Sequence, residues 1–171
     1  MADIMTTTFK ITNSNRARIL QRRPFKLQVE ESDHDGYTKL LMHTDVRRLS
    51  RGKFLQRYRD LIKEIKVFLI SRGEEYKKLE DEKWLLDLAF LTDFTFKLND
   101  LNLELQGKDK TIFQMVSSVK AFQQKLSLLA GKLEKNNLNY FPNLMAQLNS
   151  SAAINYDANR YITEIKNINR V

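Results

Sequence analysis

Four basic residues near the start of an amphipathic segment are the strongest candidates for chemistry in this sequence. They are Arg47, Arg48, Arg51 and Lys53. Guanidinium and ammonium groups at the entry to a helix can contact successive phosphates, so the cluster predicts phosphate contacts with a nucleic acid. A basic run of this kind is more commonly a solvated or ion-paired surface, and that interpretation stays open beside the first.

The two histidines, His34 and His43, give little support to metal or acid–base chemistry. They lack the four-residue spacing that places two ligands on one helix face, and no matching pair of carboxylates accompanies them. The chain has no cysteine, no nucleophilic serine elbow and no glycine-rich phosphate loop. We therefore expect no catalytic residue, no metal ligand and no cofactor, and a protein that is not an enzyme.

Acidic residues are frequent in the middle of the chain, where their spacing indicates a structural role. They stand at helical positions among apolar neighbours, so we expect most of them on the solvated face or in the first turn of a helix. These residues include Asp81, Glu82, Asp87, Asp93 and Asp100. Trp84 lies in the apolar stripe of the same segment, where core packing is a better explanation than base stacking.

The composition is that of one globular domain with a basic N-terminal third. The chain has 171 residues, of which 42% are hydrophobic and 29% charged, and its formal net charge is +8. Residues 1–60 hold 13 Lys or Arg against 7 Asp or Glu, whereas the later residues are nearly balanced, with 16 against 14. A basic surface favours a polyanion as partner. Neither a secretory signal nor a membrane-spanning stretch is evident, which predicts a nuclear or cytoplasmic protein.

Apolar residues recur at helical spacing through most of the chain, which predicts an all-α bundle of about five to six helices. Helices are expected over residues 9–23, 50–73, 81–106 and 109–133, with two more beginning near Pro142 and Tyr156. Residues 39–49 allow a single short strand. We expect residues 50–150 to form a protease-resistant core and residues 1–37 to be loosely held.

Several stretches of the sequence match motifs of a known protein family. Residues 43–53, H-T-D-V-R-R-L-S-R-G-K, resemble the H-T-D-V-R-W-L-S-R-G-K motif of hAT-superfamily transposases and the proteins derived from them. Residues 81–93, D-E-K-W-L-L-D-L-A-F-L-T-D, are a highly specific match, and residues 98–108 follow in the same order. The resemblance covers roughly residues 11–145. Arg48 replaces the family tryptophan that is thought to hold transposon DNA.

The resemblance implies a domain organisation. In the family, a long helical insertion interrupts an RNase H-like core whose two aspartates and one glutamate hold catalytic metal ions. By this likeness, residues 1–49 form a remnant of that core and residues 50–171 form the insertion-like helical domain. The three metal ligands would then fall outside this chain, which excludes two-metal strand cleavage. The family's zinc finger is absent because it requires cysteines.

Together these observations predict a catalytically inactive, transposase-derived fragment that acts as a protein-interaction or structural module. Its partner would be another protein or a second copy of the chain. The alternative is weak, non-sequence-specific nucleic-acid binding through the basic N-terminal third. We expect no membrane and no small-molecule substrate among its partners.

Overall fold

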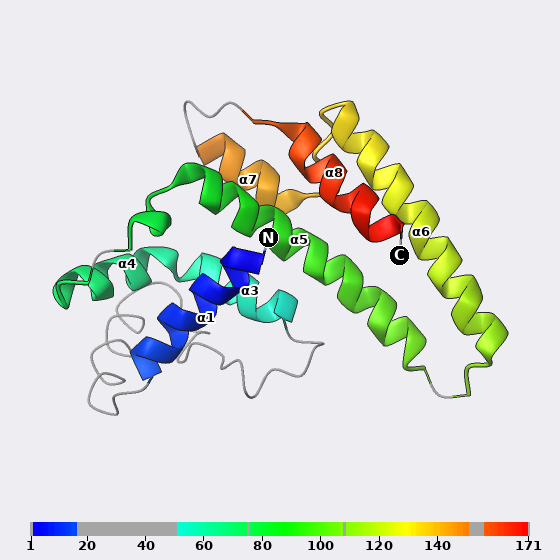
Figure 1. The fold of residues 1–171 in the computed structure, drawn as a ribbon, viewed down its shortest axis with the longest axis horizontal. Helices are drawn as coiled ribbons and strands as arrows, with labels where there is room; N and C mark the ends of the chain where they lie inside the picture. The colour runs from blue at the N-terminus through cyan, green and yellow to red at the C-terminus, as the bar shows by residue number, and fades with distance from the viewer. Residues whose placement is uncertain (1, 17–50, 75, 108, 151–155, 171) are drawn as a thin grey trace. The chain divides into compact units, whose positions relative to one another are not determined.

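The computed structural model describes residues 2–16, 51–74, 76–107, 109–150 and 156–170, and over these residues it is all-α (Figure 1). Seven α-helices and one short 3-10 helix form the regular structure of this part of the chain, which contains no strand. The predicted all-α class is confirmed. The strand expected at residues 39–49 falls outside the described ranges.

The chain folds into two compact units, which are Met1–Thr92 and Asp93–Val171. The boundary between them falls inside helix α5 (Glu82–Leu105), which agrees closely with the helix predicted over residues 81–106. The separate prediction, that residues 1–49 are a remnant of an RNase H-like core, stays a prediction.

Helix α1 (Ala2–Arg16) starts earlier than residue 9, where the sequence predicts its beginning. Ile4 and Ile11 are seven residues apart, on one face of the helix, and both are buried. Between them the buried hydroxyl of Thr8 donates a hydrogen bond to the carbonyl of Ile4 at 2.9 Å. The face of α1 that enters the core therefore carries a satisfied polar group.

The expectation that residues 1–37 are loosely held is wrong for residues 4–12. Apolar burial anchors this part of α1, and at its start the Lys78 ammonium lies 2.6 Å from the Asp3 carboxylate. The hydrogen bond from Lys78 lowers the pKa of Asp3 below its ordinary value. Residues 17–37 belong to the part of the chain that the structure leaves undescribed.

Helices α3 (Arg51–Asp60) and α4 (Ile62–Ser71) cover the segment for which the apolar spacing predicts one helix. Leu61 separates them, with φ −98° and ψ 13°. Its amide still donates to the carbonyl four residues earlier at 3.1 Å, and its carbonyl accepts from Ile65 at 2.9 Å. The break is therefore a local distortion, and it accounts for a seventh helix.

Helix α4 ends where the sequence predicts. Gly73 has φ +68°, a left-handed conformation that glycine adopts without steric cost. The Gly73 amide donates to Ile70 at 2.9 Å and the Glu74 amide donates to Leu69 at 3.0 Å. These two bonds form a Schellman motif, which satisfies the last carbonyls of the helix.

The core of the first unit combines α1, α3 and α4 with a 3-10 helix (Lys77–Leu79) and the first turns of α5. Trp84 belongs to this cluster, so its predicted role in core packing is confirmed. The buried members are Ile4, Ile11, Phe54, Leu55, Tyr58, Leu61, Ile65, Phe68, Leu69, Leu79, Trp84 and Leu88.

The second unit consists of the remainder of α5 with α6 (Ile112–Glu134), α7 (Pro142–Ser150) and α8 (Ala158–Asn169). These agree with the helices predicted over residues 109–133 and from Pro142 and Tyr156. In Figure 1, α8 lies alongside the C-terminal part of α6, coloured yellow. This pairing leaves the N-terminal part of α6 without α8 beside it.

Candidate interaction surface on helix α6

The C-terminal half of α6, residues 126–134, is covered by α8, and we call it the covered half. Four apolar side chains of this half are buried together with three from α8: Leu126, Leu129, Ala130, Leu133, Tyr161, Ile162 and Ile165. Leu128 of the same half is 52% exposed. Polar contacts align the two helices. The Lys166 ammonium lies 2.9 Å from the Glu134 carboxylate, and the Asn169 amide donates to the Ser127 hydroxyl at 3.1 Å.

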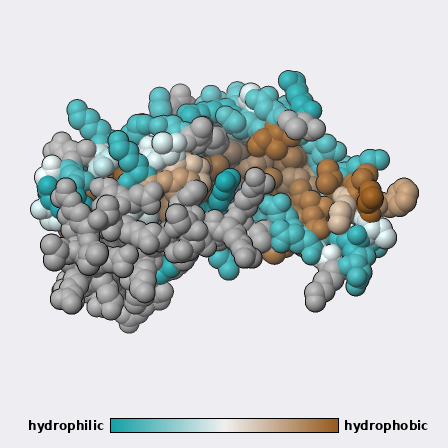
Figure 2. Space-filling model, turned by 60° about the horizontal axis from the view of Figure 1, so that its bottom comes forward, coloured by the Kyte–Doolittle hydropathy of each residue, from teal (hydrophilic) through white to brown (hydrophobic). Residues whose placement is uncertain are grey.

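Residues 112–123 form the uncovered half of α6, and large apolar side chains there are exposed. Ile112 is 77% exposed, Val116 48% and Val119 39%, and we call these three residues the exposed stripe. Their spacing of four and three residues places them on one side of the helix. Phe113, next to the stripe, is 86% exposed. Figure 2 shows hydrophobic surface at the right of the view, where α5 and α6 meet in Figure 1.

The N-terminal end of α6 is well defined although its apolar face is uncovered. Thr111 and Gln114 form a capping box, in which the Gln114 amide donates to the Thr111 hydroxyl at 3.3 Å and the Gln114 side chain accepts from the Thr111 amide at 2.9 Å. These bonds satisfy two of the free N–H groups of the first turn. The exposed stripe therefore stands on a regular helix.

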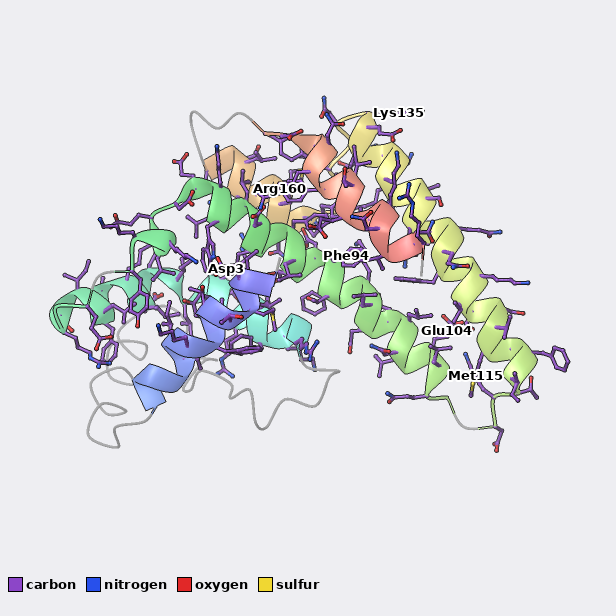
Figure 3. All side chains as sticks on the ribbon, viewed as in Figure 1. Asp3, Phe94, Glu104, Met115, Lys135 and Arg160 are labelled. Atoms are coloured by element: carbon purple, nitrogen blue, oxygen red, sulfur yellow. The ribbon has the colours of Figure 1, made fainter. Side chains whose placement is uncertain are left out.

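Helix α5 also holds this end of α6. The Ser118 hydroxyl donates to the Glu104 carboxylate at 2.6 Å, and the Lys110 ammonium lies 3.7 Å from the same carboxylate. Figure 3 labels Glu104 near the end of α5 and Met115 near the start of α6. The hydrogen bond from Ser118 lowers the pKa of Glu104 below its ordinary value.

An open depression of about 330 Å³ marks the place where α8 ends on α6. Five polar side chains line it, Lys120, Gln123, Gln124, Ser127 and Asn169. Asn169 is the last residue of α8, so the depression lies at the junction between the covered and the uncovered half.

The structure brings together only part of the basic cluster that the sequence predicts as phosphate contacts. Arg51 and Lys53 are exposed in the first turn of α3, on either side of the buried Gly52. Arg47 and Arg48 belong to the undescribed residues, as do both histidines. No group of three or more metal-binding side chains lies together within the described ranges.

Two of the five acidic residues in and beside α5 depart from the predicted solvated role. Asp87 and Asp93 are buried, at 6% and 3% exposure, whereas Asp81, Glu82 and Asp100 are exposed. Apolar residues surround α5 on more than one side, so acidic positions on this helix enter the interior.

Asp93 explains how a buried carboxylate is accommodated. It accepts hydrogen bonds from the Leu144 amide at 3.0 Å and from the backbone and side-chain amides of Asn143 at 3.2 and 2.8 Å. Phe141, immediately before α7, has no side-chain oxygen, so Asp93 supplies the N-terminal cap instead. Burial raises the pKa of Asp93, and the hydrogen bonds and the nearby Lys97 oppose that rise. This arrangement is structural.

The amino-acid pattern alone does not separate the exposed stripe from the core, because both share one helical periodicity. The available signal was length. Helix α6 has 23 residues, whereas the two helices after it have 9 and 12. A helix of 12 residues spans about 18 Å and can cover only about half of α6.

No α-helix of the described residues combines the length and apolar character needed to cross a membrane.

Residues 1–134 match the family described as the FAM200/GTF2IRD2 helical domain. Two curated relatives are named general transcription factor II-I repeat domain-containing protein 2. The Bos taurus protein is 38% identical over 157 residues, covering 91% of this chain and 16% of the relative. The Mus musculus protein is 37% identical over 157 residues, covering 91% and 17%. This chain therefore spans about a sixth of either relative's length. No solved structure matches it. The match over most of its length shows that the chain belongs to the FAM200/GTF2IRD2 helical domain family.

Proposed function

We propose that this domain is a non-catalytic protein-interaction or structural module whose contact surface is the exposed stripe of α6. The observation that carries the proposal is the exposure of Ile112, Val116 and Val119 on one side of a capped helix. Isolated apolar residues are normal on protein surfaces, whereas contiguous apolar patches mark interaction sites. Phe113 adds an aromatic side chain beside the stripe, of a type enriched at protein interfaces.

The proposal includes descent from an hAT-superfamily transposase without the cleavage activity. The motifs at residues 43–53 and 81–93 support this origin. The name of the two relatives, which refers to a general transcription factor, is compatible with a nuclear or cytoplasmic location. The purified chain should neither nick nor join transposon-end DNA in Mg²⁺ or Mn²⁺. Metal-dependent cleavage that persists through stringent purification would contradict the non-catalytic part of the proposal.

A matched pair of substitutions tests the contact surface. Val116→Asp places a charge in the exposed stripe, whereas Ala121→Asp places the same charge at an exposed position of α6 away from it. Both variants should fold, because both positions are exposed, and circular dichroism will verify their helix content. Proteins captured from a cell extract by the wild-type chain and by Ala121→Asp should be lost with Val116→Asp. Equal capture by all three chains would remove the stripe as the contact surface.

A second candidate function is weak nucleic-acid binding, favoured by the exposure of Arg51 and Lys53 in a first helical turn that holds no acidic residue. Positive side chains there add to the attraction that a helix N-terminus exerts on phosphate. With Arg47 and Arg48, they should bind duplex DNA non-specifically at about 10⁻⁴ to 10⁻⁶ M, more weakly at higher salt. Replacing all four by Ala should reduce both the affinity and its salt dependence. Binding that ignores salt would exclude this candidate.

A further inference from the structure

The covered half of α6 shows what kind of element this helix face receives. Helix α8 presents Tyr161, Ile162 and Ile165 to it, and the amphipathic spacing of these residues gives α8 one apolar side. The contacts of Lys166 with Glu134 and of Asn169 with Ser127 show that α8 runs antiparallel to α6. The face is therefore built to take an amphipathic helix.

The exposed stripe continues the same face toward the N-terminus of α6. Ile112 and Val119 precede the buried Leu126 and Leu133 at intervals of seven residues, which is two helical turns. Val116 stands in the same relation to the buried Ala130, two such intervals away. The two halves thus present one continuous line, of which α8 occupies one part. Residues 112–123 offer about 18 Å of it, the length of about three helical turns.

The charge beside this line changes sign between the two halves. In the covered half, Glu134 of α6 pairs with Lys166 of α8. Fourteen residues earlier, at the corresponding place in the uncovered half, stands Lys120. Lys120 is exposed, and Glu134 is the single carboxylate in the sequence of α6. A helix lying on the uncovered half would therefore be matched by carboxylates where α8 carries an ammonium group.

Two carboxylates of α5, Glu104 and Asp100, already interact with other groups, so they do not remove the preference of Lys120 for an acidic partner. Glu104 is already hydrogen bonded to Ser118 and close to Lys110. Burial lowers the pKa of Lys97, and the carboxylates of Asp93 and Asp100 oppose that lowering, so Asp100 already interacts with a lysine of its own helix. The ammonium of Lys120 has no ion-pair partner within the described residues.

We infer that the uncovered half of α6 binds an amphipathic α-helix of a partner protein, with apolar residues on one side and Asp or Glu along the flank. This inference rests on the proposed interaction function and names the chemistry of the partner. Pairing with a second copy through α6 fits less well. It would bring Lys120 of both copies to one interface, while Glu134 already pairs with Lys166.

Two synthetic peptides of about 14 residues, long enough for three to four helical turns, test the inference. Both repeat the spacing of Tyr161, Ile162 and Ile165 on a helix-favouring background, and they differ only in carrying Glu or Lys along the flank. Fluorescence anisotropy with the full chain at low salt should show the Glu peptide binding about three- to fivefold more tightly. Raising the salt concentration should shrink this difference.

Three variants of the chain locate the binding and its charge preference. Lys120→Glu should abolish or reverse the preference for the Glu peptide. Val116→Asp should weaken the binding of both peptides, and Ala121→Asp should leave the affinity for each peptide unchanged. Ile112→Asp provides a second stripe variant at a more exposed position, in case Val116→Asp disturbs folding.

The possible results separate this inference from the proposed function. If both peptides bind equally and Val116→Asp abolishes their binding, the inference of an acidic partner is wrong. The proposed interaction surface is then still supported. Binding of neither peptide would overturn the inference, and sedimentation of the wild-type chain would then show whether a Val116-dependent dimer occupies the stripe instead. The extract experiment decides the proposed function independently of either peptide.

Discussion

The two halves of α6 have similar apolar residues at the same helical spacing, yet this apolar face is buried in one half and exposed in the other. Leu126 and Leu133 pack against α8, whereas Ile112 and Val119 on the same line of the helix face outward. Hydrophobic periodicity therefore identifies the face of a helix that can be buried. Whether that face is buried depends on the length and position of the helices that reach it.

The largest expected effect is the difference in stability between truncating a side chain of the covered half and truncating one of the uncovered half. Leu133→Ala removes a fully buried side chain and should lower the unfolding free energy by about 2–5 kcal/mol. Val119→Ala, on the same line of α6, should change it by less than about 0.5 kcal/mol. Urea denaturation followed by circular dichroism measures both. Similar losses of unfolding free energy for the two variants would mean that the uncovered half is packed in solution and does not differ from the covered half.

The next largest effect should come from the buried cap of α7. Asp93→Ala removes a carboxylate that accepts three hydrogen bonds and should cost about 2 kcal/mol. Asp93→Asn retains one acceptor oxygen and should cost less. The same denaturation experiment measures both variants, and a loss restricted to Asp93→Ala would show that charge is unnecessary. No loss in either variant would contradict the capping role.

The cap of the uncovered half should contribute less than this buried one. Thr111→Ala breaks the capping box and should cost about 1 kcal/mol, the usual value for an exposed N-cap. Hydrogen exchange should show faster opening in the first turn of α6, with the covered half unchanged. Faster exchange throughout α6 would show that its two halves open together.

The smallest effect concerns the hydrogen bond that joins α5 to the uncovered half. Because Ser118 lowers the pKa of Glu104, this bond stabilises the fold at pH values above the ordinary pKa of a glutamate. Its contribution should disappear as the pH falls through the lowered pKa. An NMR titration of the Glu104 carboxyl group should give a value below 4.5, and Ser118→Ala should raise that value. An unchanged titration in Ser118→Ala would show that another group lowers the pKa.

The helix ends that a single residue type marks were the most accurately predicted features. Gly73 ends α4, and Pro142 begins α7, as the sequence indicates. Asn136, with φ +52°, ends α6 in the left-handed conformation that asparagine tolerates. In each case the conformational preference of one residue type is sufficient, because the relevant atoms are within a few residues of one another.

Features that depend on distant residues were not accessible in the same way. Asp93 lies about fifty residues before the amides that it caps. The helical pattern around Asp93 therefore does not predict that its side chain is buried. The anchoring of α1 by Ile4 and Ile11 likewise depends on side chains from residue 54 onward. Exposure of the stripe on α6 follows from where α8 ends, at Asn169.

The amino-acid sequence by itself determined the all-α class, the position of most helices and the apolar face of each one. It could do so because helix formation and amphipathicity are governed by residues three and four positions apart. Tertiary structure alone decided which part of each face is covered and which carboxylates enter the core. These outcomes require elements far apart in the chain to meet, and the free energy of that meeting depends on all the surfaces that it buries. The exposed stripe of α6 is the remainder that the described helices leave uncovered.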